Sequence, residues 1–186
     1  MKRVFIVHGW GGCPKEGWFP WLKKELEKKG YKVYVPKMPN TEHPKINVWV
    51  NYLSKQVGEC DKNTFFVGHS IGCQTVLRYL EKGNKKIGGA IFVAPWVKLN
   101  MKAIAEEGKE SLKIVKPWIT KPINFHKVKI LGQFVSLFSD NDDWVTFDNI
   151  KIFEKQLHSD IVILHKKGHF SGKDKIKKLP FVLKEL

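Results

Sequence analysis

The chain has 186 residues, of which 42% are hydrophobic and 27% charged, and this balance excludes a disordered chain. The net charge of +15 is mostly lysine. Only Arg3 and Arg78 supply guanidinium groups, which recognise bases and phosphates, so a nucleic-acid partner is not expected. No apolar run approaches a membrane span, so no membrane partner is expected, whereas attraction of anionic substrates stays open.

The elements expected along the chain alternate between strands and helices. Short apolar runs predict buried strands, and apolar residues at helical spacing, such as Trp18, Leu22 and Leu26, predict helices. In chain order we expect a strand over 3–8, a glycine-rich loop over 9–17, a helix from Trp18 to a stop at Gly30, a strand over 31–35, a proline-rich loop over 36–44, a helix over 48–57, a strand over 64–67, a helix over 73–80, a strand over 87–94, a less regular stretch over 99–127 with one short helix near 101–107, a strand over 130–138, a helix over 147–157, a strand over 161–164 and a last helix over 173–186.

This alternation predicts the α/β class. Six short apolar strands separated by helices favour a central parallel sheet covered on both faces, in a three-layer sandwich. The length and the absence of a linker predict one domain over residues 1–186. The stretch 99–127 is the one candidate insertion, and we expect it to form a minimal cap over the site or no cap at all.

The most informative motif is Gly68-His69-Ser70-Ile71-Gly72, which lies between a predicted strand and a predicted helix. In a G-x-S-x-G motif the serine occupies a sharp turn that exposes its hydroxyl oxygen at the carboxyl end of a sheet. The glycines are expected because side chains there would collide with the neighbouring strand and helix. Ser70 is therefore the predicted nucleophile, while His69 is expected to pack or to form hydrogen bonds.

A serine nucleophile needs a base and a third group that orients the base. His169 follows a predicted strand in a short loop and is the predicted base. Asp140, Asp142 and Asp143 share the loop after the preceding strand, and we expect Asp142, with Asp143 as the alternative, to orient the histidine. The chain order serine, aspartate, histidine is the order of α/β-hydrolases.

Two backbone amides are expected to stabilise a developing oxyanion. One is the amide of Ile71, directly after the nucleophile, and the other is that of Trp10 in the first glycine-rich loop. The same loop fits neither dinucleotide- nor P-loop spacing, and no histidine spacing suggests a metal, so we expect no cofactor and no metal.

Trp96, Trp118 and Trp144 lie in or near loops at the expected active edge. We expect them to line an aromatic, apolar pocket that would suit a hydrophobic acyl or aryl group.

These motifs give the chain a resemblance to a known family. Gly9-Trp10-Gly11-Gly12, the segment 17–28, Met38-Pro39, Trp49, the elbow, the acidic loop 140–145 and Gly168-His169-Phe170 resemble the small α/β-hydrolases typified by retinoblastoma-binding protein nine. The resemblance implies a minimal serine hydrolase with esterase-like activity, and its triad falls on Ser70, Asp142 and His169. The family's usual acidic loop reads D-P-x-[VL]-P, and both prolines are missing here. The L-x-C-x-E segment is absent from 57–62, so no pocket-protein partner is expected.

The sequence thus predicts a serine hydrolase that acts on small hydrophobic esters through an acyl-enzyme. An acyltransferase and a non-catalytic binding protein for an acidic partner are the alternatives. Three unpaired cysteines and an apolar run, Val4 to Val7, too short for a secretory signal favour a cytoplasmic protein.

Overall fold

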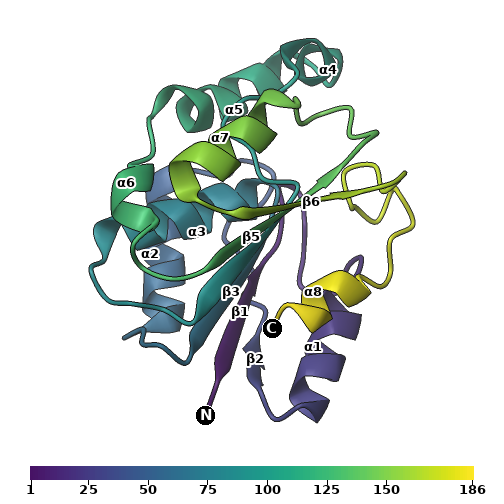
Figure 1. The fold of residues 1–186 in the computed structure, drawn as a ribbon. Helices are drawn as coiled ribbons and strands as arrows, with labels where there is room; N and C mark the ends of the chain where they lie inside the picture. Colours follow the sequence, from purple (N-terminus) through teal and green to yellow (C-terminus); the bar gives the residue numbers. More distant parts are fainter.

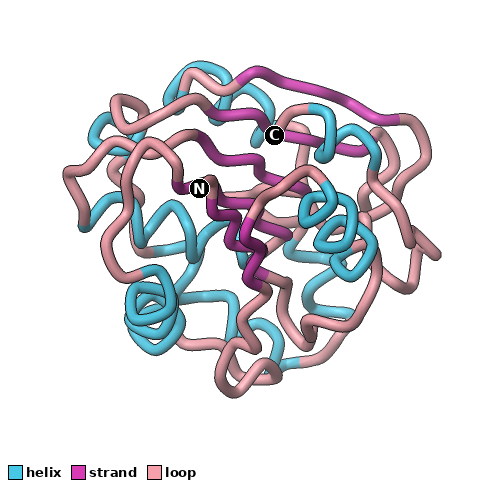
Figure 2. Tube along the Cα trace, turned by 90° about the horizontal axis from the view of Figure 1, so that it is seen from below, coloured by secondary structure: helices cyan, strands magenta, loops and turns pink.

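Six parallel strands form the central sheet in the computed structural model, which describes residues 1–186. Seen from below, the strands make one twisted layer with helices on both sides (Figure 2). They are β1 (Arg3–Val7), β2 (Lys32–Tyr34), β3 (Thr64–His69), β4 (Gly89–Val93), β5 (Phe134–Ser139) and β6 (Asp160–Leu164). The predicted α/β class with about six parallel strands is confirmed.

The helices cover both faces of this sheet. They are α1 (Phe19–Lys28), α2 (Ile46–Val57), α3 (Ile71–Lys82), α4 (Met101–Glu106), α5 (Lys109–Thr120), α6 (Phe125–Val128), α7 (Asp148–Leu157) and α8 (Pro180–Lys184). Helices α1 and α8 pack together on one face, and α2, α3, α6 and α7 cover the other (Figure 1). None of the helices combines the length and apolar composition that crossing a membrane requires.

The strand order β2-β1-β3-β4-β5-β6 places a topological switch between β1 and β3. The chain leaves β1 for β2 on one side and then returns past β1 to add the other strands in sequence. Connections at the carboxyl ends of β1 and β3 therefore diverge and leave a crevice, which is where open parallel sheets bind ligands. The pairing of Val7 with Gly68 brings the loop after β1 next to the elbow after β3.

A single cluster of 43 buried hydrophobic residues fills both sides of the sheet. Every residue of β4 is buried, which explains why this strand reads as an unbroken apolar run rather than as an alternating one. This continuous core fixes the positions of the strand ends that carry the site.

The stretch 99–127 is more regular than the sequence predicts. The expected short helix near 101–107 is confirmed as α4, but a second, 12-residue helix, α5, follows it. Ser111, Val115 and Trp118 form the buried face of α5, and Pro117 in its last turn obscures that helical pattern in the sequence. Both helices lie at the top of Figure 1, the end towards which β1 runs from the N-terminus.

Two predicted boundaries are wrong. The last helix does not span 173–186, because Asp174 caps a turn by accepting hydrogen bonds from the amide and hydroxyl of Ser171, and helix α8 begins only at Pro180. The fifth strand starts at Phe134 rather than at Ile130, whose side chain is 58% exposed.

Candidate active site

Ser70 occupies the sharp turn between β3 and α3. Its backbone angles, φ 53° and ψ −121°, are strained for a residue with a side chain. A Cβ on Gly68 would lie 2.7 Å from the Cα of Cys73, and one on Gly72 would lie 2.2 Å from the carbonyl oxygen of Val7. The strand and the helix can approach this closely only because both positions are glycine, and the turn projects Ser70 at the carboxyl end of the sheet.

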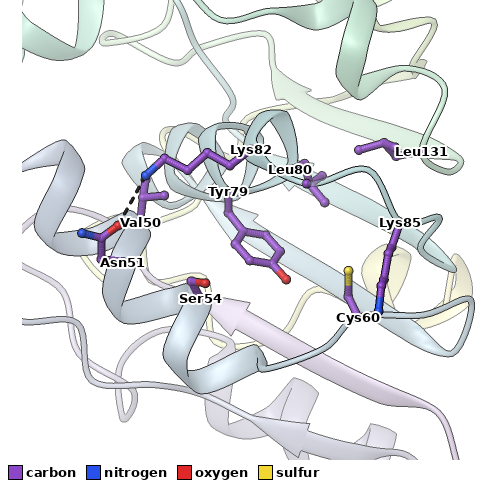
Figure 3. Close-up of a pocket in the computed structure, with 10 residues that line it drawn as sticks. Val50, Asn51, Ser54, Cys60, Tyr79, Leu80, Lys82, Lys85 and Leu131 are labelled. Carbon is purple, nitrogen blue, oxygen red and sulfur yellow. Dashed lines mark hydrogen bonds between the residues drawn. The ribbon is translucent and has the colours of Figure 1, made fainter.

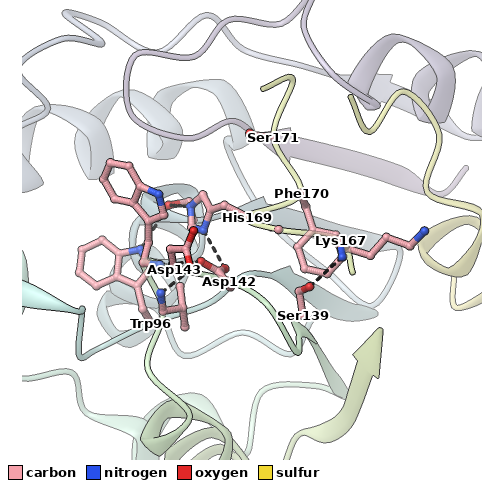
Figure 4. A network of polar contacts seen from close by, with 12 residues as sticks. Trp96, Ser139, Asp142, Asp143, Lys167, His169, Phe170 and Ser171 are labelled. Atoms are coloured by element: carbon pink, nitrogen blue, oxygen red, sulfur yellow. Dashed lines mark hydrogen bonds and ion pairs between the residues drawn. The ribbon is translucent and has the colours of Figure 1, made fainter. Parts of the chain in front are cut away.

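Ser70, His169 and Asp142 form one continuous chain of hydrogen bonds. Figure 4 shows its His169 and Asp142 part. Nε2 of His169 lies 2.8 Å from Oγ of Ser70, and Nδ1 lies 2.8 Å from Oδ2 of Asp142. The Asp142 side chain is only 3% exposed and that of His169 17% exposed, so water screens this pair weakly. Three loops from distant parts of the sequence thus meet as predicted.

The two neighbouring aspartates of the acidic loop differ in what they bind. The second carboxylate oxygen of Asp142 accepts hydrogen bonds from the amides of Trp144 and Val145, which hold the side chain towards His169. Asp143 is exposed, borders the cavity, and takes part through its backbone carbonyl, which accepts a hydrogen bond from the side chain of Asn100. Of the two alternatives left open by the sequence, the geometry favours Asp142.

The acidic loop also holds the histidine loop in place, a role that the sequence motifs did not reveal. Oγ of Ser139 accepts a hydrogen bond from the amide of Lys167, and Oδ1 of Asn141 accepts one from the amide of Gly168. Figure 4 shows Ser139 and Lys167 joined beside the His169 network. The hydrogen bonds fix the backbone immediately before His169, so the imidazole is positioned from both loops. Hydrogen bonds that clamp one loop onto another have no local sequence signature.

The histidine inside the elbow motif supports the same loop. Nε2 of His69 lies 2.7 Å from the carbonyl oxygen of His169, and its ring packs against Trp18 and Phe19. Burial lowers the pKa of His69 to about 3, with a further contribution from nearby His169, so the ring is neutral. The predicted packing and hydrogen-bonding role is confirmed.

Trp96 lies directly against the nucleophile. Its indole Nε1 donates a hydrogen bond of 3.3 Å to Oγ of Ser70, and its carbonyl accepts one from the side chain of buried Gln74. Trp96 is itself buried and does not line the open cavity, so its assignment to the pocket wall is wrong.

The other two predicted pocket tryptophans have different outcomes. Trp144 borders the cavity, with its ring centroid 6.1 Å from that of His169. The assignment of Trp118 to the pocket is wrong, because it lies at the far end of α5, packs edge-on against Trp49 and donates its indole hydrogen to the carbonyl of Pro44. The residues of α5 that line the cavity are Glu110, Ser111 and, one turn before Trp118, Ile114.

The two amides expected to bind an oxyanion are free of partners within the protein. In the loop after β1, the amide of Gly11 donates to the carbonyl of Thr41 and that of Gly12 to Gly9, whereas the Trp10 amide makes no hydrogen bond. The Ile71 amide opens helix α3 and is also unpaired. Each can donate to a ligand oxygen.

The cavity beside Ser70 has a volume of about 750 Å³ and is lined by 21 residues. Only Trp10, Ile114 and Trp144 contribute hydrophobic side chains to it. The wall is therefore largely polar, in contrast to the aromatic, apolar pocket expected from the sequence. No group of three side chains suited to a metal ion occurs in the structure.

A second, smaller cavity of about 230 Å³ lies between α2 and α3 (Figure 3). Tyr79 points into it near Cys60, and burial raises the pKa of the tyrosine hydroxyl. It shares no lining residue with the cavity at Ser70.

A model of the serine hydrolase family matches residues 4–186. The chain belongs to this family. It is therefore a serine hydrolase enzyme, and the resemblance inferred from the motifs is confirmed.

Relatives of this chain share its length. YdeN of Bacillus subtilis is 28% identical over 184 residues, covering 97% of this chain and 92% of YdeN, and the YdeN crystal structure superposes with a TM-score of 0.88. The serine hydrolase RBBP9 of Rattus norvegicus is 22% identical, covering 91% of this chain and 88% of RBBP9. A carboxylesterase structure from Nitrososphaera gargenis, 14% identical, has a TM-score of 0.74 and covers 99% of this chain and 89% of that one. The last likeness concerns the fold alone.

Proposed function

We propose that this protein hydrolyses carboxylic esters through an acyl-enzyme formed on Ser70. The observation that carries the proposal is the unbroken chain from Ser70 through His169 to Asp142, with 2.8 Å at both hydrogen bonds. These distances lie within the reach that proton transfer requires, and Ser70 stands at a turn that exposes its oxygen.

In the first half of the reaction, Oγ of Ser70 attacks the ester carbonyl carbon while Nε2 of His169 takes its proton. Asp142 holds the proton on Nδ1, so that Nε2 has a free lone pair, and it stabilises the imidazolium that forms. The tetrahedral intermediate then collapses, the bond to the alcohol oxygen breaks, and His169 returns the proton to the departing alcohol.

The negative charge on the carbonyl oxygen is stabilised by the amides of Trp10 and Ile71. Both donors are already fixed by the fold and lack competing acceptors, so no reorganisation is needed when the charge develops.

The second half of the reaction repeats these steps with water. His169 takes a proton from a water molecule, the resulting hydroxide attacks the acyl carbon, and the acid leaves as Ser70 recovers its proton. The cavity of about 750 Å³ leaves room for a small ester, and its few apolar residues, Trp10, Ile114 and Trp144, offer contacts to a hydrophobic portion.

The test is a chain-length series of activated esters hydrolysed by the wild type and by Ser70→Ala. We expect kcat/KM to fall by about 10⁴-fold or more in the variant, because the nucleophile is removed. Ser54→Ala, which changes an exposed serine on α2, is the matched control and should keep full activity. Equal turnover by the wild type and Ser70→Ala would contradict the proposal.

A further inference from the structure

The cavity that holds Ser70 has the opposite charge from the rest of the molecule. The chain contains 33 Lys and Arg against 18 Asp and Glu, nearly two bases for each acid. The 21 lining residues reverse this ratio, with one lysine, Lys173, and six acids: Glu16, Glu42, Glu107, Glu110, Asp143 and Asp174. The net charge of the chain would favour an anionic substrate. The charge of this cavity favours a cationic one instead.

The carboxylates of the cavity are largely left without cationic partners. Only Glu110 forms an ion pair, with Lys113 at 3.2 Å, and both side chains are mostly exposed. The other five carboxylates have no Lys, Arg or His nitrogen within ion-pair distance. A concave surface of one sign focuses the field and concentrates ligands of the opposite sign.

Two of the carboxylates lie against the loop that supplies the Trp10 amide. An oxygen of Glu42 lies 3.6 Å from where a Cβ of Gly11 would stand, and an oxygen of Glu16 lies 2.5 Å from the same position on Gly12. Burial raises the pKa of Glu16, as expected for a carboxylate with no cation beside it. Two carboxyl groups therefore lie beside the loop of the expected oxyanion site and not only at the outer rim, although the raised pKa makes Glu16 the easier of the cavity acids to protonate.

One residue that borders the same cavity, His69, also has a buried acceptor without a donor. Because the carbonyl oxygen of His169 can only accept, Nε2 of His69 carries the hydrogen and Nδ1 presents a lone pair. Nδ1 is buried with no hydrogen-bond partner, in a residue that is 5% exposed. It lies 3.2 Å from where a Cβ of Gly9 would stand, and Gly9 and His69 both border the cavity. An unpaired buried acceptor calls for a ligand with an N–H or O–H donor.

The aromatic residues of the cavity favour the same kind of ligand. Trp10 and Trp144 are half-buried rings on its wall, and Trp10 is held beside Glu42 by a hydrogen bond from its indole to the Glu42 carbonyl. Faces of tryptophan attract cations, and they do so most strongly next to carboxylates.

We propose that the preferred ester carries a protonated amine in its acyl or its alcohol half, held by the carboxylates and aromatic rings of this cavity. The proposal rests on the proposed ester hydrolysis at Ser70 and assigns the chemical class of its substrate. Aliphatic amines stay protonated at neutral pH, so the charge is present throughout the working range.

The test compares two isosteric pairs of esters that differ by one charge. For the acyl half, the pair is phenyl aminohexanoate, with the amine at the chain end, and phenyl heptanoate. For the alcohol half, it is the butyrate ester of aminohexanol and that of heptanol. In at least one pair we expect the amine to raise kcat/KM about tenfold or more at low salt. This advantage should shrink as salt is added, because salt screens the exposed carboxylates.

Matched variants separate the cavity from the net charge of the protein. Glu42→Gln and Glu107→Gln should each lower the ratio of amine to neutral kcat/KM about threefold. Glu154→Gln makes the same charge change on an exposed residue of α7 that does not border the cavity, and should leave the ratio unchanged.

The outcomes distinguish this proposal from the proposed function. If the neutral esters are hydrolysed in a Ser70-dependent manner but are equal or preferred in both pairs, the amine preference is wrong and ester hydrolysis stands. If Glu154→Gln lowers the ratio as much as Glu42→Gln, the cavity carboxylates are not its source. If no ester is turned over, the proposed function itself fails.

Discussion

The floor and the wall of the cavity are built in different ways. The floor, made of Ser70, Asp142 and His169, sits at the carboxyl ends of three parallel strands and is held by mutual hydrogen bonds in buried surroundings. The wall comes from loops and from α5, and most of its carboxylates are exposed and unpaired. The sheet thus positions the proposed catalytic residues, whereas the loops and α5 form the surface that a substrate would contact.

The largest expected effect on activity comes from a change at Asp142, one of the three floor residues. Asp142→Asn should lower kcat/KM by about 10²- to 10⁴-fold, because the amide no longer fixes the tautomer of His169 or stabilises its positive form. Asp143→Asn, one residue away but part of the wall, should change the rate on a neutral ester by less than about threefold. Steady-state kinetics on phenyl heptanoate measures both, and a larger loss in Asp143→Asn would exchange their roles.

Arg78 joins α5, which lines the wall, to α3, which follows the nucleophile, and its replacement should affect stability most. Its buried guanidinium donates hydrogen bonds to the side chain of Gln74 on α3 and to the carbonyls of Trp118, Lys121 and Pro122 at the end of α5. Arg78→Met leaves these acceptors unpaired and should lower the free energy of unfolding by about 2–4 kcal/mol. Urea denaturation measures this change. A loss below about 0.5 kcal/mol would show that α5 does not depend on this anchor.

The buried histidines His8 and His69 should make the free energy of unfolding fall as the pH is lowered. His69 has a pKa of about 3 in the folded protein, and burial also lowers the pKa of His8, so the unfolded chain takes up protons first as the pH drops. The contribution of these two histidines to the free energy of unfolding is therefore fully present above about pH 6.5. As the pH falls below this value, each histidine lowers the free energy of unfolding by up to about 1.4 kcal/mol per pH unit.

Urea denaturation at a series of pH values, on the wild type and on His69→Gln, tests this dependence. The variant should show a shallower loss, whereas His126→Gln, at an exposed position, is the control. Identical slopes in the wild type and His69→Gln would contradict the assignment.

The smallest expected effect comes from Trp96, which donates a hydrogen bond to the nucleophile Ser70. Trp96→Phe keeps a buried aromatic ring but removes the N–H that holds Oγ of Ser70. We expect kcat to fall about fivefold with KM unchanged, as for the loss of one neutral hydrogen bond. Trp21→Phe on α1 is the matched control, and an equal fall in both variants would assign the effect to general packing.

The same division explains how much the sequence predicts. The elbow at Ser70 is a local pattern, and the parallel sheet then places His169 and the acidic loop beside it, so the floor follows from motif and topology. The choice between Asp142 and Asp143 does not, because it depends on amide hydrogen bonds formed only in the folded turn.

The wall is less predictable for physical reasons. Helix α5 escapes detection because Pro117 interrupts its pattern, and Trp118 is misplaced because a position near a loop does not reveal which way a helix faces. The carboxylates of the wall come from five separate segments of the chain, so only the fold shows that they share one cavity in a lysine-rich protein.

Covalent labelling with a fluorophosphonate, followed by peptide mass spectrometry, tests most directly whether Ser70 is the nucleophile of this hydrolase. We predict a single adduct on the peptide that contains Ser70, abolished in Ser70→Ala, formed more slowly in Asp142→Asn and unchanged in Ser54→Ala. An adduct on another serine, or no adduct on an enzyme that hydrolyses esters, would contradict the account.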